Sequence, residues 1–370
     1  MARSVHTIAL AAGGTGGHMF PAQSLAEEAR RRGWRVILLT DARGQRYTDG
    51  FPADETVSLQ AANPNVRGAG AKLGMAWAMA GGTRTASKVL RKRRPFVTVG
   101  FGGYPSAPAM FAAKAAGLRH GVHEQNAVLG RVNRRVAPSA DFVAHGFARL
   151  DRLGRARGEV VHTGNPVREA VRRAVRPYAA PSDTANVLVF GGSQGASLFS
   201  RVFPEALSAL PEGVRDRLRV TQQVRDEEAD AVAATYRAAG IRAELAPFFA
   251  DLPRRMAEAH LVIGRSGAST VTELSVMGRP SLLVPLGIAM DDHQKANAEV
   301  LTASGAARMI EERALNAESA RAALSDLLVG ECPLPDMAER ALGLVPDDAA
   351  GRLADLCEGL LGAAARTPAA

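Results

Sequence analysis

The sequence of 370 residues is poor in several residue types, and each shortage excludes a class of protein. Its two cysteines, Cys332 and Cys357, form no cluster with other ligand residues, so a disulfide framework is excluded and a reducing compartment fits. Aromatic residues make up only 5%, too few for a surface that stacks on single-stranded nucleic acid. No apolar run reaches the ~20 residues that a membrane-spanning helix requires. The chain opens without a signal-peptide pattern, and we therefore expect a cytoplasmic protein.

The composition and length of the chain suit a globular protein of two domains. Hydrophobic residues account for 46% of the chain, which is ordinary for a soluble protein, and 370 residues are long for one domain. The formal net charge of +9 favours an acidic partner. Nucleic acid, anionic lipid and a phosphorylated substrate all remain open on charge alone.

Two glycine-rich turns divide the chain into similar halves. Residues 13–18 read GGTGGH after the apolar run 7–12, and residues 191–196 read GGSQGA after the apolar run 187–190. A strand, a glycine turn and a helix together present bare backbone amides to a phosphate. Neither turn matches the dinucleotide fingerprint or the P-loop, although Asp41 lies where a ribose-binding acid would fall. We expect two nucleotide-fold halves that are neither a nicotinamide enzyme nor a P-loop ATPase.

Strand and helix patterns alternate in both halves, which predicts α/β domains with parallel sheets and helices on both faces. The expected strands are 6–12, 36–39, 96–99, 120–123 and 142–144, followed by 187–190, 219–222, 243–245, 261–264, 281–284 and 307–310. The pattern breaks near residues 163–168, so the domains are predicted to be 1–165 and 166–348. A last helical segment, 349–362, could pack on either half. Ligands of such sheets bind at the carboxyl ends of the strands.

A third turn, residues 264–270, follows an apolar strand and opens another helix. Ser266, Ser269 and Thr270 can cap that helix or donate to an anion. Glu273 either completes a capping box or accepts hydrogen bonds from a ribose diol.

Three further polar features fall near expected strand ends. Asp291-Asp292-His293 has acids beside a histidine, but it more often forms a polar loop, and we expect no metal. Gln294 carries an amide suited to sugar hydroxyls. His18 and His123 lie in one predicted cleft, which favours acid–base chemistry.

The segment 70–94 joins an apolar part to a basic part. Leu73, Met75, Trp77 and Met79 precede a cluster that includes Arg84 and Lys88. This pattern is typical of an interfacial helix on anionic lipid, and equally of a core helix with a solvated end. Nucleic acid is a weaker alternative because the sequence has no recognisable reader fold.

In this order and spacing the motifs resemble the MurG family, the peptidoglycan glycosyltransferases that make lipid II on the cytoplasmic membrane. The matching segments are 13–18 with Pro21, 102–106, 123–126 continuing to Asn133, 164–168, 191–196, 265–268, and 292–294 with Asn297. The resemblance implies a GT-B fold of two Rossmann-like domains facing across a cleft, with the last helix crossing back to the first. It implies transfer of N-acetylglucosamine (GlcNAc) from UDP-GlcNAc to the C4 hydroxyl of the muramoyl sugar of lipid I, with inversion and without a cofactor.

The resemblance also assigns roles to residues. The donor would meet Ser193 and Arg168 at its diphosphate, Glu273 at its ribose and Gln294 at its sugar, with Phe249 beside the uracil. The nucleotide site would be lined by Ala268, Ser269, Thr270, Val271 and Thr272. The donor sugar and acceptor would be closed over by Thr15, Gly16, Gly17 and Asn126. The acceptor side would hold Tyr104, His123 and Glu124, and segment 73–94 would dock on the anionic inner leaflet, where cell-wall synthesis proteins are further partners.

The expected mechanism is direct displacement at the anomeric carbon, with oriented amides stabilising the departing UDP. His18 is the expected general base because the pKa class of histidine suits neutral pH, and Glu124 is the second choice. Two alternatives remain: an isomerase resembling UDP-GlcNAc 2-epimerase, which would need no lipid surface, and a GT-B transferase acting on another glycolipid.

Overall fold

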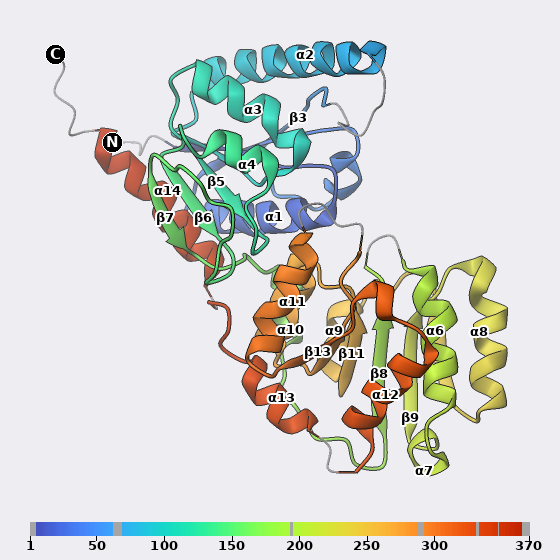
Figure 1. Cartoon of the computed structure of the whole chain (residues 1–370). Helices are drawn as coiled ribbons and strands as arrows, with labels where there is room; N and C mark the ends of the chain where they lie inside the picture. The colour runs from blue at the N-terminus through green and yellow to red at the C-terminus, as the bar shows by residue number, and fades with distance from the viewer. Residues whose placement is uncertain are drawn as a thin grey trace. The chain divides into compact units, whose positions relative to one another are not determined.

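The computed structural model describes residues 5–61, 69–192, 195–287, 292–330, 333–346 and 348–364. The chain forms two units (Figure 1): Met1–Arg168 with Pro346–Ala370, here called unit 1, and Glu169–Val345, called unit 2. Each unit is built around one parallel sheet, as the alternating pattern predicts.

Unit 1 contains a seven-stranded sheet of order β3-β2-β1-β4-β5-β6-β7. Its strands are β1 (Thr7–Ala11), β2 (Arg35–Thr40), β3 (Glu55–Ser58), β4 (Val97–Gly100), β5 (His120–Glu124), β6 (Phe142–His145) and β7 (Glu159–His162). Its helices are α1 (Gly16–Arg31), the 3₁₀ helix η1 (Gly44–Tyr47), α2 (Ala69–Arg93), α3 (Gly103–Ala115), α4 (Arg131–Val136) and α14 (Ala349–Ala364).

Side-chain alternation in β1 divides the core of unit 1 into two layers. Ile8 and Leu10 face α1 and α14, whereas Ala9 and Ala11 face α2, α3 and α4. These four residues are fully buried because helices cover both faces of the sheet. The last helix therefore completes the core of the first unit, where Leu353, Ala354 and Cys357 are inaccessible to solvent.

Unit 2 contains a six-stranded sheet of order β10-β9-β8-β11-β12-β13. Its strands are β8 (Ala185–Phe190), β9 (Leu218–Gln223), β10 (Arg242–Ala246), β11 (Leu261–Gly264), β12 (Ser281–Leu283) and β13 (Ala307–Met309). Its helices are α5 (Glu169–Ala174), α6 (Ser197–Ser208), α7 (Glu212–Arg215), α8 (Asp226–Ala238), α9 (Leu252–Glu258), α10 (Ala268–Met277), α11 (His293–Ala303), η3 (Glu312–Ala314), α12 (Ala317–Leu328) and α13 (Leu334–Ala341).

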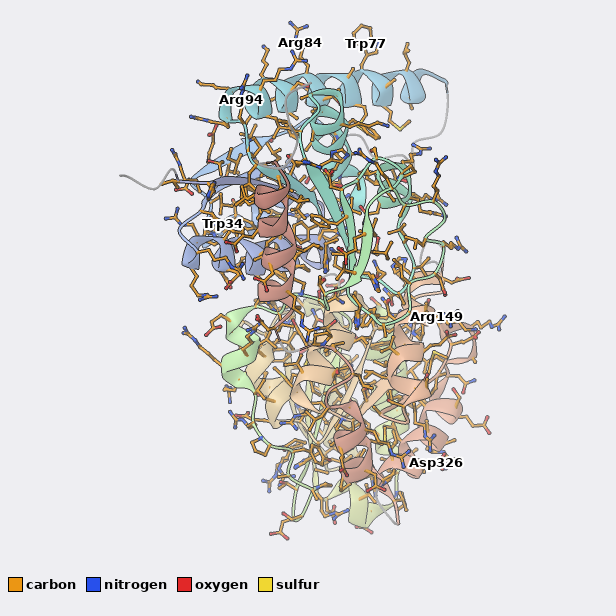
Figure 2. All side chains as sticks on the ribbon, turned by 90° about the vertical axis from the view of Figure 1, so that its left-hand side faces the viewer. Trp34, Trp77, Arg84, Arg94, Arg149 and Asp326 are labelled. Atoms are coloured by element: carbon orange, nitrogen blue, oxygen red, sulfur yellow. The ribbon has the colours of Figure 1, made fainter. Side chains whose placement is uncertain are left out.

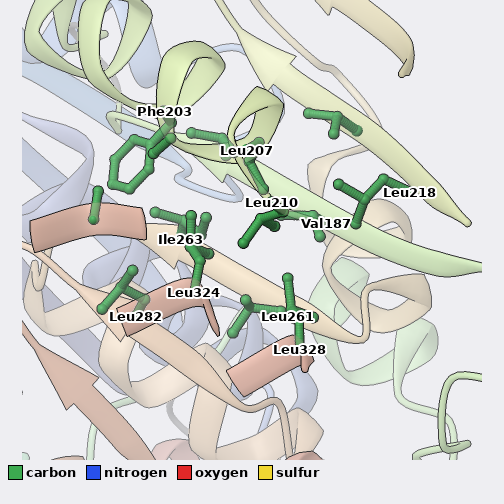
Figure 3. Close-up of a cluster of buried hydrophobic side chains, with 14 of the residues drawn as sticks. Val187, Phe203, Leu207, Leu210, Leu218, Leu261, Ile263, Leu282, Leu324 and Leu328 are labelled. Atoms are coloured by element: carbon green, nitrogen blue, oxygen red, sulfur yellow. The ribbon is translucent and has the colours of Figure 1, made fainter. Parts of the chain in front are cut away.

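Hydrophobic side chains from helices and strands fill the space between α6, α12 and this sheet (Figure 3). Phe203 and Leu207 of α6 and Leu324 of α12 pack against Val187 and Ile263, and all five are fully buried. This packing holds the carboxyl ends of β8 and β11 in place, and the glycine turns follow those ends.

Eleven expected strands lie within one or two residues of observed strands, but two observed strands were missed. Strands β3 and β7 are the edges of the first sheet. The residues of β3 alternate between partly exposed and exposed, and β7 has two exposed residues followed by two partly exposed ones. Without burial they need no apolar run, and the sequence pattern therefore gave no signal for them.

Candidate active site

The first glycine turn lies at the carboxyl end of β1 and opens α1. A Cβ atom at Gly13 would lie 2.5 Å from Asp41 Oδ1 and 2.7 Å from Pro105 Cβ, so only glycine fits there. Asp41 Oδ1 accepts hydrogen bonds from the amides of Gly14 and Gly44, both at 2.9 Å. The carboxylate thus stabilises the turn, and the alternative role of Asp41 at a ribose is not supported.

Helix α1 begins beyond this turn with its amide dipoles directed at the strand end. Thr15 is the N-cap and makes no side-chain cap, which leaves the first amides of the helix without a capping side chain. The guanidinium of Arg168 stacks over Phe20 at 4.0 Å. A Cβ atom at Gly16 would lie 2.7 Å from the same Phe20 ring, so Arg168 is held beside the first turn of α1. This corner of unit 1 is a suitable environment for an anion.

His18 lies in this first turn, partly exposed, beside the start of α3. A Cβ atom at Gly103 would lie 3.0 Å from His18 Cδ2, so a side chain there would displace the imidazole. The His18 Nδ1 atom is 3.1 Å from Gln125 Oε1. Tyr104 is half-buried next to Gly103 and packs partly on the core below α3. The structure thus brings His18, Tyr104 and the segment after β5 together at the carboxyl ends of the strands.

Glu124 is buried, and its carboxylate holds the loop that follows β5. Its Oε1 accepts from the Asn126 amide at 3.1 Å and from Asn126 Nδ2 at 3.0 Å. Its Oε2 accepts from the Gly130 amide at 2.8 Å and from Asn133 Nδ2 at 2.9 Å. Four donors occupy both oxygens, so the structure corrects the expectation of a general base: Glu124 positions Asn126 and its loop.

His123 is fully buried, which corrects its expected place on the acceptor side. Adjacent residues of a strand point to opposite faces, and His123 points toward the ring of Phe101, 5.7 Å away. Its Nε2 atom donates to the carbonyl of Gly164 at 2.9 Å. Burial lowers the pKa of His123 to about 4, so the ring is neutral at neutral pH.

The donor-side motifs of unit 2 lie at the carboxyl ends of β8, β11 and β12. Gly191 is packed so closely that a Cβ atom would lie 2.4 Å from the Ala196 amide nitrogen, which explains its glycine. Ser193 lies outside the described residues. The N-cap of α10 is Gly267, which has no side chain, so the first of the two alternatives for Ser266, Ser269 and Thr270, capping of this helix, is not what the structure shows.

Polar side chains bind the turn before α10 to its neighbours. Ser266 Oγ donates to the Gln294 carbonyl at 2.7 Å, and Asn297 Nδ2 donates to the Ser266 carbonyl at 3.1 Å. Gln294 Oε1 accepts the amide of Leu286 at 3.0 Å. Arg265 pairs with Glu312. Although burial raises the pKa of Glu312, the Gly287 amide and Arg265 lower it overall.

Burial separates the expected nucleotide-lining residues into two groups. Ser269 and Thr270 are partly exposed in the first turn of α10, whereas Ala268, Val271, Thr272 and Glu273 are at most 9% exposed. The side chains of Val271 and Thr272 are 0% and 1% exposed and face the interior, so a nucleotide could contact only their backbone, whereas Glu273 is 9% exposed. Phe249 is also buried, with Arg255 4.4 Å above its ring, and is not a stacking surface for uracil.

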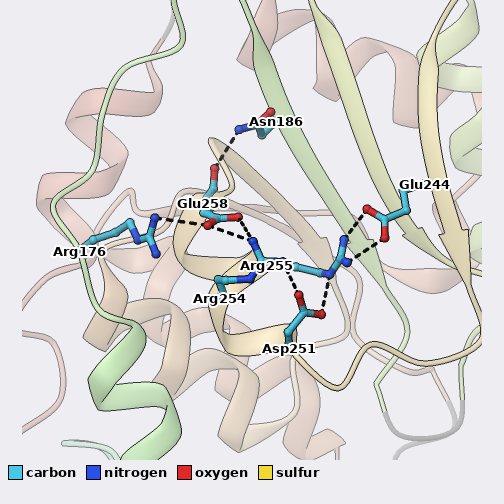
Figure 4. A network of polar contacts seen from close by, with 7 residues as sticks. All are labelled: Arg176, Asn186, Glu244, Asp251, Arg254, Arg255 and Glu258. Carbon is cyan, nitrogen blue, oxygen red and sulfur yellow. Dashed lines mark hydrogen bonds and ion pairs between the residues drawn. The ribbon is translucent and has the colours of Figure 1, made fainter.

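A groove of about 410 Å³ lies at the other end of the strands of the second sheet, where β8, β9 and β10 begin. Ion pairs form its wall (Figure 4): Arg255 bridges Glu244 and Asp251, while Glu258 accepts from Arg176 and Arg254. These charges satisfy one another, and none of the motifs that suggest chemistry reaches the groove. Within the described ranges no group of three histidine, cysteine, aspartate or glutamate residues can hold a metal.

On the long helix α2, a stripe of exposed residues faces away from the core of unit 1. Leu73 and Trp77 are 62% and 72% exposed, and Arg84 and Lys88 are also exposed. At 3.6 residues per turn these four positions fall within about 60° of one another. Figure 2 shows Trp77 and Arg84 projecting from the same side of the helix. Met75 is half-buried and Met79 packs partly on the core, so neither belongs to the exposed stripe.

Two family models match the two halves of the chain. The glycosyltransferase family 28 N-terminal domain matches residues 8–145, and the C-terminal domain of the same family matches residues 186–350. The paired parallel-sheet units and the glycine turns at their strand ends therefore define a family 28 glycosyltransferase with Rossmann-like domains.

Relatives that match nearly the whole chain identify the family more closely. The UDP-N-acetylglucosamine--N-acetylmuramyl-(pentapeptide) pyrophosphoryl-undecaprenol N-acetylglucosamine transferase of Caulobacter vibrioides is 47% identical over 94% of this chain and 97% of its own. That of Sinorhizobium fredii is 45% identical over 95% of each chain. The crystal structure of MurG from Acinetobacter baumannii superposes with a TM-score of 0.78 at 28% identity, covering 96% of this chain and 99% of its own. The chain belongs to the MurG family.

Sequence analysis quoted Asn133 and the segment that contains Gln125 without assigning roles to these two residues, and it did not mention Glu312. Gln125 and Asn133 carry side chains that contact candidate residues, and adjacency to His123 and Glu124 was the available signal. Glu312 gave none, because its contact with Arg265 spans 47 residues of sequence.

Proposed function

We propose that this protein transfers GlcNAc from UDP-GlcNAc to the C4 hydroxyl of the muramoyl sugar of lipid I, with inversion at the anomeric carbon, to give lipid II. The observation that carries the proposal is the 47% identity, over nearly the full length of both chains, to a transferase named for this reaction. The glycine turns at the strand ends of both units supply the chemistry that such a transfer requires.

For the donor, we assign the partly exposed first turn of α10 and the neighbouring backbone to the nucleotide. Ser269 and Thr270 donate to the diphosphate, Glu273 accepts from the ribose, and Gln294 contacts the sugar. We assign Ser193 of unit 2 to the diphosphate as well, and in unit 1 we assign Arg168 and the amides near Gly16 to the binding of an anion. Such preoriented donors stabilise the transition state more than the ground state, and loss of one donor costs roughly 3 kcal/mol of activation free energy.

For the acceptor, His18 takes the C4 proton as the hydroxyl attacks the anomeric carbon. His18 is partly exposed at the strand end, whereas Glu124 is fully engaged by four donors and His123 is buried. Asn126, held by Glu124, and Tyr104 lie at the same edge of unit 1 and are assigned to the bound sugars.

For the lipid, we propose that the stripe of Leu73, Trp77, Arg84 and Lys88 docks on an anionic membrane surface. An apolar end enters the interface and a basic end pairs with headgroups. No helix in the described part of the chain has the length and apolarity to cross a bilayer.

The direct test incubates the protein with UDP-GlcNAc and a lipid I analogue and identifies the products by mass spectrometry. Formation of a disaccharide lipid and UDP supports the transfer. Formation of UDP-N-acetylmannosamine without acceptor would overturn it in favour of a 2-epimerase.

The same assay tests His18. We expect His18→Ala to lower kcat at least 100-fold while both substrates still bind, because general-base catalysis contributes about 10²–10⁴-fold. Near-normal kcat in that variant, with both substrates saturating, would remove His18 from the base role.

A further inference from the structure

The side-chain amide of Gln125 connects the partly exposed His18 to the buried His123. Gln125 is 2% exposed and follows β5 directly. Its Oε1 atom is 3.1 Å from His18 Nδ1, and its Nε2 atom is 3.0 Å from His123 Nδ1 and 3.0 Å from the His123 carbonyl oxygen. Three residues from two strand ends therefore form one chain of hydrogen bonds.

Elimination determines the direction of these bonds. A carbonyl oxygen only accepts, so the Gln125 atom beside the His123 carbonyl must be the amide nitrogen. Oε1 then faces His18 and must accept, which requires that His18 Nδ1 carries the proton. The Nε2 atom of a neutral His18 is consequently unprotonated.

His123 locks the amide of Gln125 in this orientation. Its Nε2–H donates to the Gly164 carbonyl at 2.9 Å, so the Nδ1 atom of the neutral ring accepts from Gln125. Both hydrogens of the Gln125 amide are thereby used. Asn165 Nδ2 adds a bond of 2.9 Å to the Gln125 main-chain oxygen. A rotated amide would place like atoms together in a buried site.

We propose that Gln125 is a positioning residue that holds His18 in the Nδ1–H tautomer, with the lone pair of Nε2 available to the acceptor hydroxyl. This inference rests on the proposed function, in which His18 is the general base. The hydroxyl oxygen forms its bond to the anomeric carbon, the bond from that carbon to the diphosphate oxygen breaks, and the electron pair leaves with UDP. The hydroxyl proton passes to His18 Nε2.

The test reads the tautomer directly by long-range ¹H–¹⁵N NMR of protein labelled at its eight histidines, at a pH where the imidazoles are neutral. The spectrum of His18→Ala assigns the His18 signal. We expect the Nδ1–H form in the native protein and mainly the Nε2–H form, which free imidazole side chains prefer in water, in Gln125→Met. We also expect kcat to fall at least tenfold, with KM for both substrates within twofold. The matched control, Gln45→Met, changes an exposed glutamine of the same unit and leaves both readouts unchanged.

An unchanged tautomer or an unchanged kcat in Gln125→Met would overturn the proposal. If that variant does not fold, Gln125→Glu replaces it: the carboxylate still accepts from Nδ1, and its charge moves the acidic limb of the pH–kcat profile to higher pH. An unmoved limb would likewise overturn it. The tautomer measurement needs no substrate, so a Gln125-dependent tautomer beside a fully active His18→Ala variant would overturn the base role in the proposed function rather than the hydrogen-bond chain.

Discussion

The polar residues of the candidate site in unit 1 are of two kinds. Some have polar atoms that a substrate can reach, and the others hold those residues in place. Glu124 and His123 have the polar groups of catalytic residues, yet protein donors and acceptors occupy them completely. His18 reaches the edge of the sheet and is held there through Gln125. Chemical type alone therefore does not assign a role, because burial decides which polar atoms a substrate can reach.

Replacement of Glu124 tests its positioning role. In Glu124→Gln an NH₂ group faces buried donors, and we expect a loss of roughly 2–3 kcal/mol in the free energy of unfolding of unit 1. Urea unfolding followed by tryptophan fluorescence measures this, because Trp34 and Trp77 both belong to unit 1. Glu159→Gln, on an exposed edge strand, should stay within about 0.5 kcal/mol. Equal stability of the two variants would contradict the role.

The buried His123 makes the stability of unit 1 depend on pH. Its pKa is about 4 in the folded protein against an ordinary 6.5, so the unfolded chain binds more protons between these values. Stability is complete above pH 6.5 and falls as the pH drops toward 4, by about 2 kcal/mol between pH 7.5 and 5. Urea midpoints of Trp34 fluorescence should show a shallower pH dependence in His123→Asn. An identical slope in both proteins would refute this origin.

At the scale of elements, helix α2 turns two large apolar side chains to solvent. Its inner side contributes Ala86 and Leu90 to the core of unit 1, while Leu73 and Trp77 lie on the opposite side. Leu73 and Trp77 are four residues apart and therefore neighbours on the helix surface, and an exposed apolar patch rimmed by polar residues often marks an interaction site. The stripe continues for about four turns, from its apolar to its basic end.

Changes to this stripe should alter membrane binding without altering the chemistry. We expect Leu73→Ser with Trp77→Ser to weaken co-sedimentation with anionic vesicles at least tenfold, because apolar burial contributes about 1.5–3 kcal/mol per side chain. Arg84→Glu with Lys88→Glu should weaken it mainly at low salt. Val160→Ser, an exposed position on β7, is the control. Activity on a soluble acceptor should be retained, and unaltered vesicle binding in both double variants would exclude α2 as the docking surface.

At the scale of the whole molecule, the chain leaves unit 1, forms unit 2 and returns to complete unit 1 with α14. Arg32, the C-cap residue of α1, pairs with Asp355 and Glu358 of α14, and Leu353 of the same helix packs into the core. Burial raises the pKa of the Cys357 thiol, which suppresses its reactive thiolate. The first unit is therefore complete only when the last helix is present.

The rate of thiol modification at Cys357 should show whether α14 is packed on unit 1. In a Cys332→Ser background we expect Cys357 to react with iodoacetamide only when unit 1 opens. Leu353→Ala should cost about 2–4 kcal/mol and speed the modification at least tenfold, because it leaves a cavity under α14. Leu342→Ala, an exposed position in unit 2, should not change the rate. Rapid modification of the native protein would show that α14 does not protect Cys357.

The sequence by itself determined the α/β class, most of the strands, the glycine turns and the family, because these depend on local periodicity and on residues that only a particular backbone conformation accepts. Only the tertiary structure decided that His123 and Phe249 are buried, that Glu124 is saturated by donors, and that edge strands β3 and β7 exist. It also decided which side of α2 faces solvent and where Gln125 reaches. The physical reason is that burial and hydrogen-bond partners come from residues far apart in the chain, and no local pattern records them.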